Sequence, residues 1–226
     1  MKKALLPIFA AFGLLALVAA FVFVYVNGNG NGNSADAGPG EGSSTQPRAS
    51  AVASDSHYID EVGPDAVTVV EFLDFECEAC AYFHPFVEEL RAVYDGEINY
   101  VVRYFPLPVH LNGMDAAIAA EAAAQQGEFE GMYQRLFETQ GEWGNGAAPA
   151  PQTDFFRELA VDLGLDMDAY DATVADPATT ARIDADFDAG VELGVSSTPT
   201  FFVNDRPVAI KQLEDLPAAI DAALKR

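Results

Sequence analysis

Cysteine, histidine and basic residues are all scarce in this chain. Its 226 residues include two cysteines, three histidines and 12 lysines and arginines, against 35 aspartates and glutamates. So few basic side chains cannot neutralise a phosphate backbone, and we therefore expect no nucleic-acid partner. The chain has no second Cys-x-x-Cys and no closely spaced pair of histidines, which leaves too few ligands for the four that structural zinc usually takes. We expect neither a metal site nor a cofactor.

Apolar residues, in contrast, are plentiful. Half of the chain is hydrophobic and 11% is aromatic, so that roughly 170 residues can form one domain with a substantial core. The part after Val26 contains 10 basic and 35 acidic residues, a net charge of -25. We interpret this excess of acid as a means of solubility, with a charge-selective substrate site as the alternative.

The longest apolar run lies at the N-terminus. Lys2 and Lys3 precede 23 uncharged residues, Ala4–Val26, a length that can span a bilayer as one transmembrane helix. A cleaved signal peptide has a shorter apolar region, so we favour an uncleaved anchor over cleavage. Positive charge on the N-terminal side places the N-terminus in the cytoplasm and the rest of the chain outside. The sequence therefore predicts a single-pass protein of the cell membrane, with a cytoplasmic stub and anchor over 1–26 and an extracytoplasmic domain.

Residues 27–54 form a second region of distinct composition. They are mostly glycine, asparagine, serine, alanine and proline, which cannot build a core and which favour a flexible linker. The folded domain is expected over residues 55–226. Because an exported domain lies in an oxidising compartment, a redox role for its two cysteines becomes more significant than in a cytosolic chain.

The two cysteines, Cys77 and Cys80, lie between two apolar patterns. Val67–Phe75, before them, is rich in β-branched and aromatic residues, which predicts a buried strand. Apolar residues after them recur at three- and four-residue steps, which predicts a helix. At such a junction the unpaired N–H groups and the helix dipole lower the pKa of a thiol. We therefore predict that Cys77 is an accessible, reactive thiolate and that Cys80 is a sheltered, resolving thiol.

Other roles for these residues stay open on spacing alone. The pair is also compatible with half of a zinc site or with a structural disulfide, although a bridge that closes so short a loop constrains the unfolded chain little. Glu71, six residues before Cys77, interrupts the apolar strand. It is either a carboxylate that reaches solvent or an acid buried beneath the dithiol. In the buried position, desolvation would raise its pKa and let it exchange protons with Cys80.

The remaining patterns predict an α/β fold with an inserted all-helical subdomain. A second buried strand is expected over 98–107, so that strand, helix and strand form a right-handed parallel unit. Helical periodicity then covers about residues 112–194 almost throughout. Two strands around an Asn204-Asp205 turn and a final helix complete the pattern.

This arrangement resembles the DsbA-like thiol-disulfide oxidoreductases, which are thioredoxin folds with a helical insertion. The resemblance covers about residues 65–225 and rests on the segments EFLDFECEAC, FPLPVH and STPTFFVN. The site residues that it implies are the attacking Cys77, the resolving Cys80, the buried acid Glu71 and the cis peptide Thr198-Pro199, which faces the dithiol.

The resemblance also implies a function and partners, and the chain departs from the family pattern in one place. It implies an enzyme that introduces disulfides into cysteine-containing exported proteins, with a membrane redox partner that is a quinone-linked reoxidant or an electron carrier. Two alternatives remain, a reductase or isomerase fed by a membrane electron carrier and a non-catalytic thioredoxin-fold binding ectodomain. Family oxidants commonly carry proline and histidine or another aromatic between the cysteines, where this chain has Glu78 and Ala79. Because Glu76 and Glu78 oppose a thiolate, we expect the pKa of Cys77 to exceed that of the strongest family oxidants.

Overall fold

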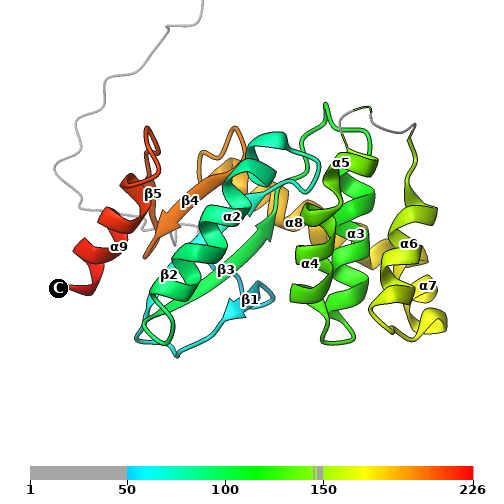
Figure 1. Ribbon diagram of the computed structural model, residues 1–226, viewed down its shortest axis with the longest axis horizontal. Coiled ribbons are helices and arrows are strands. Elements are labelled where there is room, and N and C mark those ends of the chain that lie inside the picture. Colours follow the sequence, from blue (N-terminus) through cyan, green and yellow to red (C-terminus); the bar gives the residue numbers. More distant parts are fainter. Residues whose placement is uncertain (1–49, 145, 147–149, 226) are drawn as a thin grey trace, which may run out of the picture. The chain divides into compact units, whose positions relative to one another are not determined.

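The computed structural model of the chain describes residues 50–144, 146 and 150–225 (Figure 1). The predicted anchor over 1–26 and most of the predicted linker lie outside the described residues. Among the described residues, no helix is long and apolar enough to cross a membrane. The strands are β1 (His57–Asp60), β2 (Val67–Leu73), β3 (Ile98–Tyr104), β4 (Thr200–Val203) and β5 (Arg206–Val208). The helices are α2 (Glu78–Val93), α3 (Gly113–Ala124), α4 (Phe129–Glu138), α5 (Gln140–Trp143), α6 (Thr153–Asp162), α7 (Met167–Ala175), α8 (Pro177–Glu192) and α9 (Asp215–Leu224).

The strands form one sheet in the order β1-β3-β2-β4-β5. β2 and β3 pair in parallel, from Val67 opposite Ile98 to Leu73 opposite Tyr104, and α2 is the connection between them, as predicted. The other neighbouring strands pair antiparallel. β4 and β5 meet at the predicted turn, where Asn204 has a φ of 49°, a left-handed conformation that asparagine tolerates well. The parallel unit and the hairpin are therefore both confirmed.

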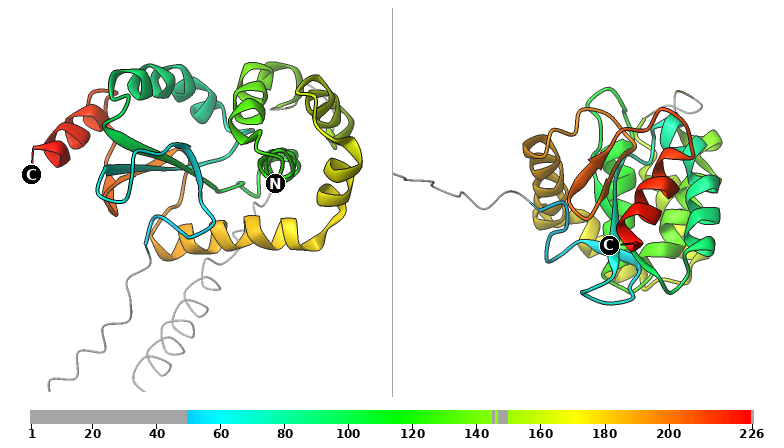
Figure 2. Two further views of the ribbon diagram at one scale, coloured as in Figure 1. Left: turned by 90° about the horizontal axis from the view of Figure 1, so that it is seen from below. Right: turned by 90° about the vertical axis from the view of Figure 1, so that its left-hand side faces the viewer.

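The sheet is covered on both faces, which explains why its central strands are apolar throughout. β3 is buried along its whole length and β2 nearly so. Figure 2 shows the sheet between α2 on one side and α8 on the other. The first face packs against α2 and α9 through residues such as Val69, Phe201, Val203, Val87 and Ile220. The second face packs against the end of α8 through Val70, Phe72, Val101, Phe202 and Phe187.

The segment between β3 and β4 is the predicted helical insertion. It runs from the start of α3 at Gly113 to the end of α8 at Glu192, which agrees closely with the predicted range. Buried alanines cover most of α3, so that α4, α6, α7 and α8 can all pack closely around it. In α4 the apolar residues at 129, 132, 133, 136 and 137 form one buried face, as their three- and four-residue spacing requires.

The N-terminal boundary of the folded domain differs from the predicted one. Ala51 is fully buried, and its N–H donates to the Asp205 carboxylate at 2.7 Å. Its carbonyl accepts from the Arg103 guanidinium at 3.2 Å. The predicted boundary at residue 55 is therefore wrong by a few residues. The linker-like composition hid this packing, because the contacts use main-chain groups, which every residue carries.

Candidate active site

The two cysteines lie where β2 leads into α2. β2 ends at Leu73, and α2 begins at Glu78 with Cys77 as its N-cap residue. The carbonyl of Cys77 accepts a hydrogen bond from the N–H of Ala81 at 3.1 Å. Both thiols are free, and 7% of Cys77 is exposed against 1% of Cys80. Cys77 is the more accessible cysteine, as predicted, but it is much less open to solvent than its position at a helix start suggests.

The two sulfur atoms have opposite acidities. A hydrogen bond from the Cys80 thiol lowers the pKa of Cys77 to about 5. Burial opposes this effect, while the Thr198 side chain and the N–H groups of Cys80 and Ala79 lower the pKa further. Burial, the hydrogen bond to Cys77 and the charge of Glu71 raise the pKa of Cys80 well above its ordinary value. The Cys77 value lies above the roughly 3.5 of DsbA and below the roughly 7 of thioredoxin, in agreement with the expectation from the sequence.

A cis peptide bond faces Cys77 just before β4. The Thr198–Pro199 bond is cis, which confirms the geometry implied by the family resemblance. The Sγ atom of Cys77 donates to the carbonyl oxygen of Thr198 at 3.5 Å. The buried hydroxyl of Thr198 has no nitrogen or oxygen partner in the described part of the chain, so it is available to the sulfur. The main chain of Thr198 therefore borders the thiolate directly.

Glu71 lies on β2, close to the dithiol, and is only 2% exposed. Its Oε2 atom accepts a hydrogen bond from the hydroxyl of Tyr100 at 2.6 Å. Burial raises the pKa of Glu71 to about 7; the Tyr100 hydrogen bond lowers it, and the charges of Glu88 and Cys77 raise it. The structure thus favours the buried alternative. A carboxyl group that titrates near neutral pH beside Cys80 is able to exchange protons with that thiol.

Asp74 and His110, for which the sequence predicted no role, complete the turn before Cys77. The Oδ1 atom of Asp74 accepts from the N–H of Glu76 at 2.8 Å. Its Oδ2 atom lies 2.7 Å from the N–H of Leu107 and 2.6 Å from Nδ1 of His110. Burial raises the pKa of Asp74, and these hydrogen bonds oppose the rise. An aspartate just after a strand is a recognisable turn signal, but no local pattern points to a partner 36 residues away.

The helical insertion also contacts the active-site turn. The side chain of Gln140, in α5, donates to the carbonyls of Phe75 at 2.7 Å and Cys77 at 3.1 Å. Glu76 is only 3% exposed, and its Oε2 atom accepts from the N–H of Asn112 at 2.5 Å. Its carboxylate thus lies at the start of α3, where the helix dipole stabilises negative charge. The two acids that flank Cys77 thus differ in environment, since Glu76 is buried and Glu78 is exposed.

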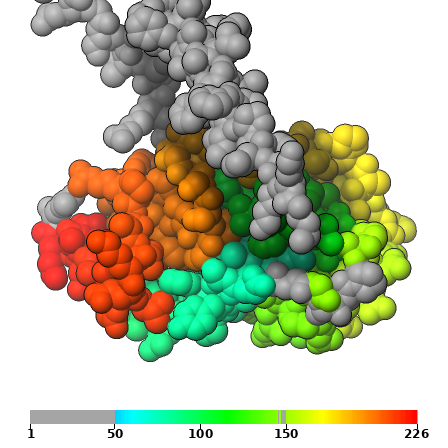
Figure 3. All heavy atoms as spheres, turned by 90° about the horizontal axis from the view of Figure 1, so that it is seen from above, coloured from blue at the N-terminus to red at the C-terminus, as the bar shows by residue number. Residues whose placement is uncertain are grey.

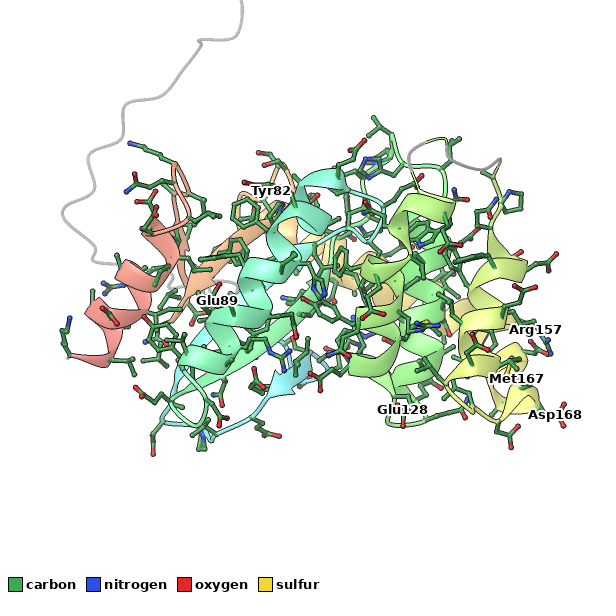
Figure 4. The ribbon with its side chains drawn as sticks, in the orientation of Figure 1. Tyr82, Glu89, Glu128, Arg157, Met167 and Asp168 are labelled. Atoms are coloured by element: carbon green, nitrogen blue, oxygen red, sulfur yellow. The ribbon has the colours of Figure 1, made fainter. Side chains whose placement is uncertain are left out.

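Exposed apolar side chains surround this end of the domain. Tyr82 of α2 is 72% exposed, and Val109 and Leu111, in the loop between β3 and α3, are 77% and 75% exposed. Figure 4 shows Tyr82 near the start of α2, where the dithiol lies, and Glu128 at the opposite end of the domain. Figure 3 looks onto the end that carries Tyr82 and shows α2 (blue-green) between the orange chain around β4 and the yellow-green helices of the insertion. The dithiol therefore has an apolar border.

The same region of the chain matches a known family. A family model described as Thioredoxin matches residues 64–222. The chain belongs to the thioredoxin family. The matched range contains both cysteines, Glu71 and the cis peptide, so every predicted site residue lies within it.

Solved structures agree with this assignment. The chain is similar to a thioredoxin-like oxidoreductase from Silicibacter pomeroyi DSS-3, at 27% identity and a TM-score of 0.64, over 80% of this chain and 98% of that one. Its fold is also similar to that of alpha-DsbA1 from Wolbachia pipientis, at 20% identity and a TM-score of 0.64, over 77% of this chain and 93% of that one. It is similar as well to the fold of BdbD from Bacillus subtilis, at 21% identity and a TM-score of 0.63, over 73% of this chain and 91% of that one. The thioredoxin-family fold of this chain is thus the DsbA-like form, with a helical insertion.

The chain also matches longer proteins named Na(+)/H(+) antiporter NhaA. One from Herminiimonas arsenicoxydans is 37% identical over 151 residues, which cover 66% of this chain and 23% of that protein. NhaA 3 from Salinispora tropica is 45% identical over 141 residues, which cover 62% of this chain and 20% of that protein. The chain thus spans about a fifth of the length of these curated relatives.

Proposed function

We propose that the protein is a membrane-tethered, extracytoplasmic enzyme that introduces disulfides into exported proteins through Cys77 and Cys80. The observation that carries the proposal is the difference in acidity of the two cysteines, a pKa of about 5 for Cys77 and a strongly raised pKa for Cys80. A stabilised thiolate favours the reduced form of the pair. The disulfide form is then an effective oxidant of client thiols, which favours the oxidase role over the reductase role.

The reaction begins from the disulfide form. A client thiolate attacks Sγ of Cys77, the Cys77–Cys80 bond breaks, and Cys80 leaves as a thiolate that accepts a proton from Glu71. A second client thiolate then attacks the client sulfur of the mixed disulfide. A disulfide forms within the client, and Cys77 leaves as the stabilised thiolate. The client loses two electrons and the protein gains two, which a quinone-linked membrane partner removes to restore the Cys77–Cys80 disulfide.

The cis peptide and the apolar border give the client a place to bind. The carbonyl of Thr198, 3.5 Å from the Cys77 sulfur, lies where an extended client segment is able to pair with the main chain. Tyr82, Val109 and Leu111 are exposed apolar side chains that suit the apolar segments of an unfolded client. Binding through the main chain and through apolar contacts does not depend on one client sequence, which fits an enzyme with many clients.

The membrane tether rests on the sequence of the first 26 residues. Two lysines followed by 23 apolar residues favour a helix that crosses the bilayer with its N-terminus in the cytoplasm. The test is the accessibility of Cys77 in intact cells to a membrane-impermeant thiol reagent after mild reduction. Labelling only after the cells are lysed would contradict an extracytoplasmic domain.

Trapping of clients tests the proposed reaction. In a Cys80→Ser variant the resolving thiol is absent, so mixed disulfides between Cys77 and clients should accumulate and should disappear on reduction. The Cys77→Ser variant is the matched control and should trap none. The purified full-length chain should also oxidise a reduced, unfolded client, with a reduction potential between the roughly -120 mV of DsbA and the roughly -270 mV of thioredoxin. Insulin reduction without client oxidation would favour the reductase, and neither activity would favour the binding ectodomain.

The antiporter matches favour one further partner for this domain. Two proteins named Na(+)/H(+) antiporter contain a segment that is 37% and 45% identical to this chain within much longer polypeptides. We therefore include a membrane antiporter among the proposed partners. Purification of the Cys80→Ser variant from its own membranes, followed by identification of the proteins bound through Cys77, tests this partner directly. Absence of any antiporter from that set and from the proteins bound without a disulfide would contradict it.

A further inference from the structure

The loop between β3 and α3 closes around the side chain of Asp74. The N–H of His110 donates to the carbonyl of Leu107 at 3.0 Å, which forms a tight turn. The same two residues bind Oδ2 of Asp74, Leu107 through its N–H at 2.7 Å and His110 through Nδ1 at 2.6 Å. On the other side, a side chain at Gly113 would place its Cβ only 2.7 Å from Oδ1 of Asp74. The carboxylate is thus held in one position between the loop and the start of α3.

Asp74 links this loop to the dithiol through the main chain. Its carbonyl accepts from the N–H of Cys77 at 3.1 Å, and its Oδ1 accepts from the N–H of Glu76 at 2.8 Å. The imidazole of His110 is therefore attached, through one fully buried aspartate, to the turn that carries the reactive sulfur. The side chain of His110 is 13% exposed, so its charge is only partly screened by water.

We propose that His110, held by Asp74, is the cation that stabilises the Cys77 thiolate in this protein. It takes the part of the histidine or other aromatic residue that family oxidants carry between the cysteines, where this chain has Glu78 and Ala79. His110 acts through space and through Asp74, so it is a positioning residue for the thiolate. The proposal deepens the proposed redox function and rests on it only for the identity of the thiolate.

The charges around His110 support this role. Burial lowers the pKa of His110, but the hydrogen bond to Asp74 and the charges of Asp74, Cys77 and Glu76 raise it more, so the net shift is upward. The cleft beside His110 has a volume of about 250 Å³ and adds one further acid, Asp184 of α8; its other walls are apolar. Asp74, Glu76, Cys77 and Asp184 are thus potential anions beside His110, and they favour the imidazolium.

The two other histidines do not share this environment. His84, one turn past Cys80, lies 3.2 Å from the hydroxyl of Tyr133. Burial lowers the pKa of His84 more than the charges of Glu88 and Glu138 raise it, which favours the neutral imidazole. His57 instead lies 2.8 Å from Glu121 of α3, and its ring stacks on the ring of Phe129. His84 is therefore a matched control for a histidine that is close in sequence to the dithiol but uncharged.

The first test compares the thiolate in His110→Asn and His84→Asn variants of the full-length chain. Asparagine places an N–H₂ group near the position of Nδ1, which keeps a donor for Asp74 while the charge is lost. The titration of the thiolate absorbance in the reduced protein should show a rise of about one unit in the pKa of Cys77 for His110→Asn, a tenfold lower thiolate fraction at acid pH. The His84→Asn variant should match the unchanged chain. An unchanged Cys77 titration in a folded His110→Asn variant would overturn the proposal.

The second test uses the unchanged chain, so it does not depend on the folding of a variant. If His110 stabilises the thiolate, the thiolate must stabilise the imidazolium by the same free energy. Nuclear magnetic resonance titration of the histidines should then show a higher pKa for His110 in the reduced form than in the disulfide form. Equal His110 values in the two forms would overturn the proposal. Neither test uses a client protein. A failure of client oxidation would therefore not affect their outcome, and a negative outcome of either test would not contradict client oxidation.

Discussion

At the scale of single residues, Glu71 couples the stability of the fold to pH. The pKa of its carboxyl group is about 7 in the folded protein, against an ordinary value of 4.5 that applies in the unfolded chain. Below pH 4.5 the carboxyl is protonated in both states, so no penalty arises. As the pH rises from about 4.5 to about 7, the unfolded chain loses its proton first, and the folded protein loses up to about 3 kcal/mol of stability relative to the unfolded chain. Glu71 therefore opposes folding at neutral and alkaline pH.

The variant Glu71→Gln should remove this penalty. Glutamine still accepts the hydrogen bond from Tyr100, which lies 2.6 Å from the carboxylate, and it carries no charge. Urea unfolding of the reduced protein should show a gain approaching about 3 kcal/mol at pH 8 and little gain at pH 4. Client oxidation should become slower, because Cys80 loses its proton donor. An equal gain in stability at both pH values would contradict the assigned pKa.

Glu78 follows Cys77 directly, and we expect its charge to oppose the thiolate. It is exposed and lies in the first turn of α2, where a negative charge adjacent to the thiolate disfavours it. The variant Glu78→His should lower the pKa of Cys77 by about one unit and raise the reduction potential by about 30 mV. Equilibration with glutathione measures the potential. Glu89→His, an exposed change further along the same helix (Figure 4), is the control and should have a much smaller effect.

At the scale of secondary-structure elements, the short helix α5 supports the turn between β2 and α2. Gln140 donates to two carbonyls of that turn, at 2.7 and 3.1 Å, and is itself buried. Without these bonds the carbonyls of Phe75 and Cys77 lose their side-chain donor in a region that water reaches poorly. The insertion thus fixes the position of the dithiol as well as covering the end of the sheet.

The variant Gln140→Met tests this contact. Loss of the hydrogen bonds should destabilise the fold by about 1 to 3 kcal/mol in urea unfolding. The rate at which Cys77 reacts with an alkylating reagent should also change, because the turn that carries it is less fixed. Gln126→Met is the matched control: Gln126 bonds the main chain of Asp166 within the insertion, so its loss should weaken the insertion but leave the Cys77 rate unchanged.

At the scale of the whole domain, a buried ion pair joins the insertion to the sheet. Arg103 of β3 binds Asp186 of α8 at 2.6 Å, and 3% and 2% of the two side chains are exposed. Asp186 also accepts from the N–H of Tyr104 at 3.1 Å and from Arg182 at 2.6 Å. Arg182 also pairs with Glu121 at 3.2 Å, whereas Asp186 is the carboxylate that pairs with the buried Arg103, at the place where the helical subdomain meets the sheet.

The variant Asp186→Asn should be among the most destabilising changes in the domain. It leaves the buried Arg103 without its counter-ion, a loss of about 3 to 5 kcal/mol. Urea unfolding of the full-length chain provides the measurement. Asp171→Asn, which breaks the half-exposed pair with Arg157 (Figure 4), is the control and should leave the unfolding transition nearly unchanged. Similar effects of the two variants would contradict a special role for the buried pair.

The sequence by itself determined the order of the elements and the identity of the dithiol. Alternation and helical spacing act over a few residues, so the parallel unit, the insertion over 112–194 and the hairpin at Asn204 were all predictable. The Cys-x-x-Cys spacing at a strand-to-helix junction is equally local, and it predicted the lowered pKa of Cys77. The boundary at residue 55 was wrong because main-chain contacts such as those of Ala51 leave no pattern in the side chains.

Only the tertiary structure decided which distant groups meet the dithiol. His110 lies 36 residues from Asp74, and Gln140 lies 63 residues from Cys77, yet each pair is within hydrogen-bonding distance. The burial of Glu76 against the start of α3 depends on the same packing. The physical reason is that electrostatic effects on a thiolate depend on distance and burial in three dimensions. Sequence separation records neither quantity once the chain has folded around its sheet.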